Sequence, residues 1–599
     1  MLYCCRGEDA LLTKLQKCGR CGLAEYCIRE CQRGDWKLHK VKCKRLTEIV
    51  VRQGRCDVRK LLRSGALRRR LLTLSEGTII LTIRDPDITT IGDMILPRER
   101  ARFEAPFFEC KSLLRVDLQG CTKLTSVGDA AFWDCSSLTS LVLPDSLTQL
   151  GNGAFNRCSS LTSVMLPDSI TQISMGAFQD CSSLTSLVLP GSLTHLGEAT
   201  FANCTSLTSV VLPDSLTHMG ESAFAACTSL TSVVLPDSLT QLGVSAFANC
   251  TSLTSVVLPD SLTMLGEGAF VECTSLTSVV LPDSLTQLGK GSFQDCTSLK
   301  SVVMPDSLTQ LGDVAFERCN SLTSVVLPDS LTQLGVGAFL RCSSLTSVVL
   351  PDSLTQIGEQ AFGGCTSLTS VVFPDSLTQM GDGAFGECTS LTSAVLPNSL
   401  TQLGKQAFCE CTSLTSVVLP NSLTQVGMGA FGICTSLMSA VLPDSITQVG
   451  EGAFVECTSL ISVVLPDSLT QLGDVAFKRC DSLTSIALPA CAKLGDNVFA
   501  KCNALLQEAD LAGFASVELY LRDRYRSITL RKLVLRLLRK YNQAVNNADG
   551  TEAEKHATAL ALFPADNTGS LEFGLFLQKM NLSGGDGVIG LVGYILEFV

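Results

Sequence analysis

The sequence predicts an α+β, multidomain chain in which a parallel-β solenoid of about 18 coils lies between a small cysteine-rich head and a helical C-terminal end. Two observations predict it. A phenylalanine recurs every 23 residues from Phe132 to Phe477, and a cysteine follows each of them three positions later. Six cysteine and histidine residues also lie within 26 residues near the N-terminus. A fixed period of this size is typical of a solenoid, because one coil cannot bury its apolar face until a neighbour stacks on it.

Charge and hydropathy differ along the 599 residues. Residues 1–75 hold 19 Lys and Arg against 7 Asp and Glu, a balance of +12, so the remainder of the −11 chain carries −23. This asymmetry predicts different partners for the two parts. No run of 18 apolar residues predicts a membrane span, and the N-terminus lacks a signal-peptide layout. We therefore expect an intracellular protein, cytoplasmic or nuclear, whose 29 cysteines form no disulfides.

The head has the spacing Cys18-x2-Cys21-x5-Cys27-x3-Cys31-x7-His39-x3-Cys43, preceded by Cys4 and Cys5. Zinc takes four nitrogen or sulfur ligands, and paired thiols a few residues apart can hold one such ion. The segment is too short and too polar to build a core, so metal binding would supply its folding energy.

The run KCGRCGLAEYCIRECQRGDWKLHKVKC resembles a MYND-type zinc finger over roughly residues 4–43. This resemblance implies two zinc ions. It implies that Cys18, Cys21, His39 and Cys43 hold one ion, and that Cys27 and Cys31 share the other with the first cysteine pair. That pair departs from the family's Cys-x2-Cys, because Cys4 and Cys5 are adjacent. Either the chain begins within the pair, leaving one ion, or both cysteines bind in an unusual geometry. The family's role implies a protein-interaction module, and several fingers of this family take Pro-rich peptides.

Residues 44–75 are basic, with Leu residues among the charges, and we expect a helix there. Two readings stay open: a solvated linker helix that caps the solenoid, or a segment that contacts nucleic acid or an acidic partner.

One repeat unit runs from Leu253 to Cys273, LTSVVLPDSLTMLGEGAFVEC. Val256 and Leu258 alternate with Val257 as in a strand, and Pro259 ends that strand. We expect one short strand per coil, an Asx-type turn at Asp260, and a tight bend at Gly266. The pattern LPDSLTQLGxxAFxxCTSL resembles the BspA-type leucine-rich repeat from about residue 100 to 503.

Three columns of the repeat bear on function. The cysteine column (Cys135 to Cys480) is expected to be buried as small apolar residues. The aspartate column after each proline is expected either to form local hydrogen bonds or to attract cations, a basic partner or the chain's own basic ends. The valine column is expected on the open sheet face, where it marks a contact site or reflects β-propensity alone. Its members are Val142, Val188, Val211, Val234, Val257, Val280, Val303, Val326, Val349, Val372, Val395, Val418, Val441 and Val464.

After Cys502, residues 504–546 are expected to be helical and to cap the last coil. We therefore expect four regions: a finger at 1–46, a basic helical linker at 47–75, the solenoid at 76–505, and a helical C-terminal region at 506–599.

The sequence shows no phosphate-binding loop, dinucleotide fingerprint or catalytic triad, and His195 and His218 occupy equivalent exposed positions. The prediction is a non-enzymatic, zinc-binding adaptor between proteins. The alternative is a nuclear regulator whose basic region contacts nucleic acid while the finger recruits a co-repressor.

Overall fold

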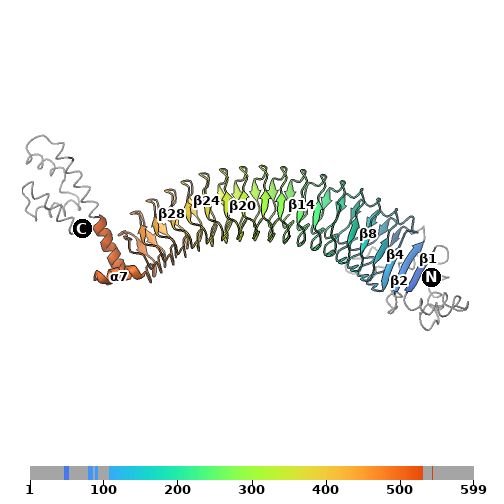
Figure 1. Cartoon of the computed structure of the whole chain (residues 1–599), viewed down its shortest axis with the longest axis horizontal. Coiled ribbons are helices and arrows are strands. Elements are labelled where there is room, and N and C mark those ends of the chain that lie inside the picture. Colours follow the sequence, from blue (N-terminus) through green and yellow to red (C-terminus); the bar gives the residue numbers. More distant parts are fainter. Residues whose placement is uncertain (1–45, 53–77, 85–87, 92–106, 530–542, 544–599) are drawn as a thin grey trace, which may run out of the picture.

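The computed structural model describes residues 46–52, 78–84, 88–91, 107–529 and 543. Within these ranges the chain forms a parallel-β solenoid bent into an arc, with helices at its C-terminal end (Figure 1). The finger and most of the residues beyond 529 lie outside the described residues. No helix in the described part of the chain is long and apolar enough to cross a membrane.

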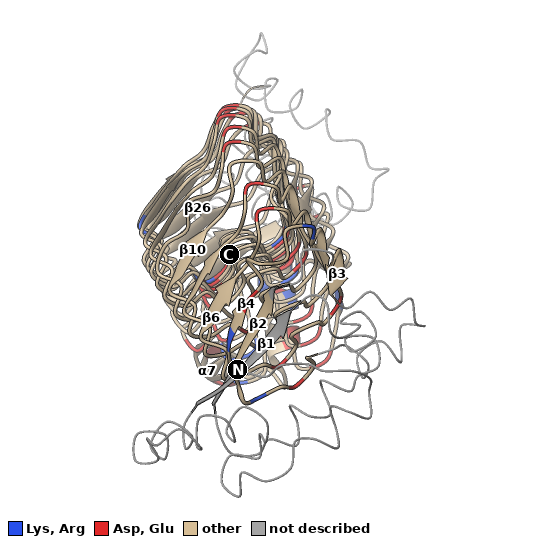
Figure 2. Cartoon of the chain, turned by 90° about the vertical axis from the view of Figure 1, so that its right-hand side faces the viewer, with Lys and Arg blue, Asp and Glu red and all other residues tan. Residues whose placement is uncertain are grey.

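Most coils contribute two strands, where the sequence pattern predicted one. The first is the Ser-Val-Val strand, and the second is a Gln-Leu strand that follows the Pro-Asp-Ser turn. The second strand forms because the residues after the turn are again extended and pair with the same residues of the next coil, as Gln333 pairs with Gln356. The two sets lie on different sides of the solenoid, with β10 (Ser186–Val188) and β3 (Thr90–Ile91) on opposite sides in Figure 2.

All pairings are parallel, and within the repeat they join equivalent residues of neighbouring coils, as between Ser255 and Ser232. The first set comprises β6 (Ser140–Val142), β8 (Ser163–Met165), β10, β13 (Ser232–Val234), β14 (Ser255–Val257), β16 (Ser278–Val280), β18 (Ser301–Val303), β20 (Ser324–Val326), β22 (Ser347–Val349), β24 (Ser370–Val372), β26 (Ser393–Val395), β28 (Ser416–Val418), β30 (Ser439–Val441) and β32 (Ser462–Val464). The second set comprises β3, β5 (Ser126–Val127), β7 (Gln149–Leu150), β9 (Gln172–Ile173), β11 (His195–Leu196), β12 (His218–Met219), β15 (Met264–Leu265), β17 (Gln287–Leu288), β19 (Gln310–Leu311), β21 (Gln333–Leu334), β23 (Gln356–Ile357), β25 (Gln379–Met380), β27 (Gln402–Leu403), β29 (Gln425–Val426), β31 (Gln448–Val449), β33 (Gln471–Leu472) and β34 (Lys493–Leu494).

The sheet begins earlier than predicted. Strand β1 (Leu46–Arg52) pairs with β2 (Thr78–Arg84), which pairs with β4 (Leu113–Asp117). The expectation of a helix from residue 44 is therefore wrong for 46–52. The β-branched run at Ile49, Val50 and Val51 favours a strand, and it adds one more strand to an existing parallel ladder. Residues 53–75, the rest of the expected basic linker, lie outside the described residues.

The core is a continuous stack of phenylalanines. Eighteen rings from Phe107 to Phe499 follow one another, with centroids 4.8 Å apart at the first pair and 5.8 Å apart at the last. Each ring from Phe132 to Phe477 is fully buried. Offset stacking of aromatic rings adds to the free energy gained from burying them, so every coil is held to the next along the same line.

Glycine is required where the coils approach most closely. A Cβ built at Gly266 would lie 2.7 Å from the backbone carbonyl carbon of Gly243 in the preceding coil. The predicted reason, a bend that only glycine permits, is wrong here, because the close approach of two backbones excludes a side chain.

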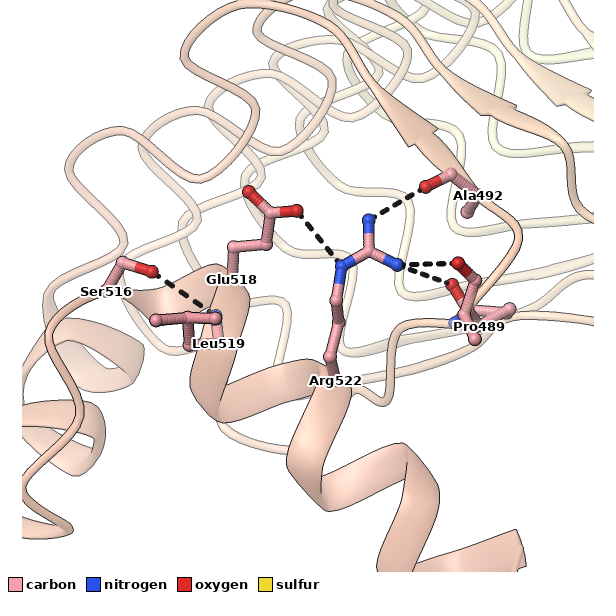
Figure 3. Close-up of polar contacts among 7 residues, drawn as sticks. Pro489, Ala492, Ser516, Glu518, Leu519 and Arg522 are labelled. Carbon is pink, nitrogen blue, oxygen red and sulfur yellow. Dashed lines mark hydrogen bonds and ion pairs between the residues drawn. The ribbon is translucent and has the colours of Figure 1, made fainter.

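The C-terminal helices cap the last coil. Helix α7 (Asn503–Leu511) ends before Gly513, whose φ is +76°, and helical structure resumes at residues 517–529. The predicted single helix from 504 is thus broken, because Gly513 takes a left-handed conformation. Arg522 donates to the carbonyl oxygens of Ala490 at 2.9 Å and Ala492 at 3.0 Å (Figure 3). Leu521 is fully buried in the core. The predicted capping role is confirmed for residues 503–529, and the rest of the expected helical segment, apart from residue 543, lies outside the described residues.

Candidate interaction surfaces

The valine face is the surface formed by the third residue of the Ser-Val-Val strands. From Val188 to Val464, thirteen consecutive coils place a valine there with 52–81% of its surface exposed. Met165, which takes the same position, is 72% exposed, and Val142 is half-buried. The side chain before each valine points inward, as the two-residue period of a strand requires. The predicted exposure of this column is confirmed from Val188 onward.

A threonine column that flanks the valine face is hydrogen-bonded from coil to coil over most of its length. Thr254 Oγ1 donates to the Thr231 carbonyl at 3.0 Å, and Thr277 Oγ1 donates to Thr254 at 3.3 Å. These hydroxyls are satisfied by the neighbouring coil, so they do not compete for a partner's polar groups. A long apolar stripe bordered by satisfied hydroxyls suits a partner with an apolar surface.

The aspartate column occupies the turns that join the two strand sets, and its members are exposed. Serine supplies the local hydrogen bonds: Ser261 Oγ donates to the Leu239 carbonyl at 2.9 Å, and Leu262 N–H closes the turn on Pro259. Among the described residues, only Asp467 of this column uses its carboxylate, which accepts from Tyr525 Oη at 3.0 Å. The expected Asx role is therefore wrong. Figure 2 shows acidic residues following one another along the narrow edge at the top of the view.

The cysteine column is structural. Each thiol from Cys135 to Cys502 donates to the carbonyl of the preceding coil's phenylalanine, as Cys158 does to Phe132 at 3.3 Å. Burial raises the pKa of these thiols, to about 12 for Cys181 and Cys250, so they are protonated at neutral pH. All of them are buried, which confirms the predicted burial of this column. No group of histidine, cysteine and carboxylate side chains that could hold a metal ion occurs in the part of the chain that the structure describes.

His195 and His218 lie side by side on β11 and β12, and their ring centroids are 4.2 Å apart. The Nδ1 atom of each ring lies 2.8 Å from the hydroxyl of the preceding threonine. The predicted exposed, neighbouring pair is confirmed for His218, while His195 is half-buried. Parallel rings point their remaining nitrogens in the same direction, so the pair does not converge on one metal ion.

A groove on the Gln-Leu side went unnoticed at the sequence level. It has a volume of about 820 Å³ and runs along β23 to β33. Its lining consists of four columns: the glutamines, the apolar residue after each glutamine, the close-packed glycines, and the residue after each glycine. Because the glycines cannot carry side chains, the surface is hollow between the columns on either side of them. The 23-residue recurrence of Gln-Leu-Gly was the signal that could have revealed it.

The predicted zinc ligands Cys4, Cys5, Cys18, Cys21, Cys27, Cys31, His39 and Cys43 lie outside the described residues, so their geometry remains a prediction.

Comparison with known proteins identifies both modules. The model of the BspA-type leucine-rich repeat region matches overlapping segments that together span residues 102–506, which is more than half of the chain. The chain belongs to the BspA-type leucine-rich-repeat family. The MYND finger model matches residues 3–43, which agrees with the resemblance seen in the head.

The curated relatives share only the finger. SET domain-containing protein 14 of Caenorhabditis elegans is 58% identical over 33 residues, which are 6% of this chain and 8% of that protein. The N-lysine methyltransferase SMYD2-A of Danio rerio is 62% identical over 29 residues, which are 5% of this chain and 7% of that protein. This chain therefore spans less than a tenth of the length of these relatives.

Two solved structures resemble part of this chain. A leucine-rich repeat protein from Bacteroides ovatus is 28% identical with a TM-score of 0.44, over 62% of this chain and 87% of that chain. A leucine rich cell surface protein from Faecalibacterium prausnitzii is 24% identical with a TM-score of 0.31, over 62% and 83%. The two family models together show a MYND finger, a family that implies zinc binding, and a leucine-rich-repeat solenoid, and both modules are typical of protein interaction.

Proposed function

We propose that this BspA-type repeat protein is a non-enzymatic adaptor that joins two proteins, one held by the zinc finger and one by the solenoid. The observation that carries the proposal is the valine face. Thirteen exposed valines lie next to one another. Their combined apolar area exceeds the few hundred Å² that the largest apolar patch of a monomeric protein usually covers. The fold does not require valine there, because the buried neighbour in each strand already supplies the core contact.

The finger half of the proposal rests on its ligand set. Cys18, Cys21, His39 and Cys43 would hold one zinc ion, and the finger would fold only around metal. Cys27 and Cys31 would bind a second ion with Cys4 and Cys5. The finger's partner would be a protein, and a Pro-rich peptide is the class that the family resemblance implies.

The solenoid half of the proposal also fits a reducing compartment. Its cysteines are free and buried, and a folded chain with so many reduced thiols is typical of proteins inside the cell. We therefore place the adaptor in the cytoplasm or the nucleus.

The test captures partners with the full chain and two sets of variants. His39→Ala with Cys43→Ser removes two ligands of one zinc site and leaves the solenoid unchanged. Val257→Thr, Val280→Thr and Val303→Thr together remove apolar surface from the valine face and keep β-branched side chains. The bound zinc of each protein is measured by mass spectrometry, and the captured proteins are identified with and without a chelator.

The proposal expects two separate groups of partners. The finger variant and the chelator remove one group and lower the bound zinc, while the valine variant removes the other group and leaves the zinc unchanged. If both variants capture the same proteins as the unmodified chain, the adaptor proposal is wrong.

A further inference from the structure

The groove along β23 to β33 has two unlike walls. One wall is a column of six glutamines from Gln356 to Gln471, and the floor is the glycine column. Gln356 Nε2 donates to Gln379 at 2.9 Å, whereas the amides of the four following glutamines form no hydrogen bond within the described residues. These free amides offer donors and acceptors to the backbone of an extended peptide, which carries one of each per residue.

The opposite wall is mostly acidic. It presents Glu359, Asp382, Glu451 and Asp474, all exposed, with Lys405 and Met428 between the two pairs. None of the four carboxylates forms an ion pair within the described part of the chain. Elsewhere on the solenoid, carboxylates of neighbouring coils are neutralised by arginine, as Asp295 is by Arg318 at 3.7 Å. The groove therefore keeps a negative potential that favours a basic ligand.

The arrangement of these charges sets the spacing of the ligand. The pair Glu359 and Asp382 and the pair Glu451 and Asp474 lie four coils apart. Parallel strands lie about 4.8 Å apart, so the centres of the pairs are separated by about 19 Å. An extended chain rises about 3.3 Å per residue, so about six residues of peptide span this distance. Lys405 lies between the pairs and disfavours a third basic side chain there.

We propose that this groove binds an extended segment of a partner protein that carries two basic side chains about six residues apart. The glutamine wall bonds the peptide backbone, and each acidic pair receives one basic side chain. This inference rests on the proposed adaptor function, because it names the chemistry of one partner of the solenoid.

The test measures binding of synthetic peptides to the full chain by fluorescence anisotropy near physiological salt. The probe is a serine- and threonine-rich peptide with two arginines six residues apart. A second peptide of the same composition has its arginines three residues apart, and a third has an additional central arginine. The groove variant combines Glu359→Gln, Asp382→Asn, Glu451→Gln and Asp474→Asn. It keeps the acceptor atoms of Asp382 and Asp474, whose Oδ1 atoms accept backbone N–H groups at 2.7 Å.

A matched control variant removes the same charge from the aspartate column. Asp329→Asn, Asp352→Asn, Asp375→Asn and Asp444→Asn change four exposed residues, and Asn398 and Asn421 show that this column accommodates asparagine. We expect the groove variant to weaken binding by about ten-fold or more and the control variant by less than about two-fold. The two altered peptides should bind at least about five-fold more weakly than the probe.

Equal losses in the two variants would mean non-specific attraction and would overturn the inference, as would affinity that does not depend on arginine spacing. Absence of measurable binding would overturn it as well. If partners are still captured through the finger and the valine face in any of these cases, the groove inference fails and the adaptor proposal survives.

Discussion

Val279 and Val280 are neighbours on strand β16, yet 2% of the first side chain is exposed and 64% of the second. Both positions repeat along the solenoid. The inner column repeats because each side chain packs against the coils above and below, where a change of one methyl group is felt. The outer column touches no core, so packing does not explain its valines. Repetition alone therefore does not distinguish structure from function, because both columns repeat and only their exposure differs.

The largest expected effect tests the inner columns through pH. Burial raises the pKa of Cys181 and Cys342 from 9.0 to about 12. Below about pH 9 these thiols are protonated in both states and do not change stability. Above it the unfolded chain loses protons first, so the free energy of unfolding falls as the pH rises toward about 12. Burial raises the thiol pKa throughout the cysteine column. Denaturant titrations from neutral to alkaline pH should therefore show a steep loss of unfolding free energy above about pH 9.

A control for this titration replaces three residues of the cysteine column by alanine: Cys181, Cys250 and Cys342. The variant should be less stable at neutral pH but should lose stability less steeply above about pH 9, because fewer thiols ionise. If the unfolding free energy falls equally steeply with pH in the two proteins, the role assigned to the cysteine column is contradicted.

The next effect concerns the phenylalanine stack. Phe270→Ala leaves a cavity between Phe247 and Phe293, whose rings lie 5.6 and 5.5 Å from that of Phe270. We expect a loss of about 3–5 kcal/mol in unfolding free energy, together with faster hydrogen exchange in the adjacent coils. A loss below about 1 kcal/mol would show that the stack does not hold the coils together.

A smaller effect separates two kinds of glycine. Gly266→Ala places a methyl group against the backbone of Gly243, and we expect a loss of about 1–3 kcal/mol from overpacking. Gly191 is the matched control, because a Cβ built there meets nothing within 4 Å. Gly191→Ala should leave the unfolding free energy within about 0.5 kcal/mol of the unmodified protein. Equal losses at the two positions would contradict the close approach of the coils.

The sequence predicted the repeating interior well, because a 23-residue period places Phe270 and Cys273 at equivalent buried positions in every coil. It also predicted the outward valines, because strand alternation fixes which side chain faces out. It missed β1, because Leu46–Arg52 shares no repeat signature and its pairing depends on a strand more than thirty residues away. It missed the groove, because a hollow arises from backbones in neighbouring coils, and a single repeat does not show it.

The aspartate column also shows that a single repeat does not reveal contacts between neighbouring coils. A sequence reading assigned hydrogen bonding to Asp260, but the structure gives that role to Ser261, which reaches the preceding coil. Which of two adjacent polar residues reaches back depends on how the coils stack, and local turn chemistry alone does not determine it.

The most direct test compares two matched triple variants of the full chain. The inner variant carries Val256→Thr, Val279→Thr and Val302→Thr, and the outer variant carries Val257→Thr, Val280→Thr and Val303→Thr. Both are measured for unfolding free energy and for capture of the proteins that the unmodified chain binds. We expect the inner variant to lose about 1–2 kcal/mol per residue, because buried hydroxyls replace methyl groups. We expect the outer variant to keep its stability within about 0.5 kcal/mol per residue and to lose its partner. An outer variant that keeps both its stability and its partner would contradict the claim that the valine face is a binding surface.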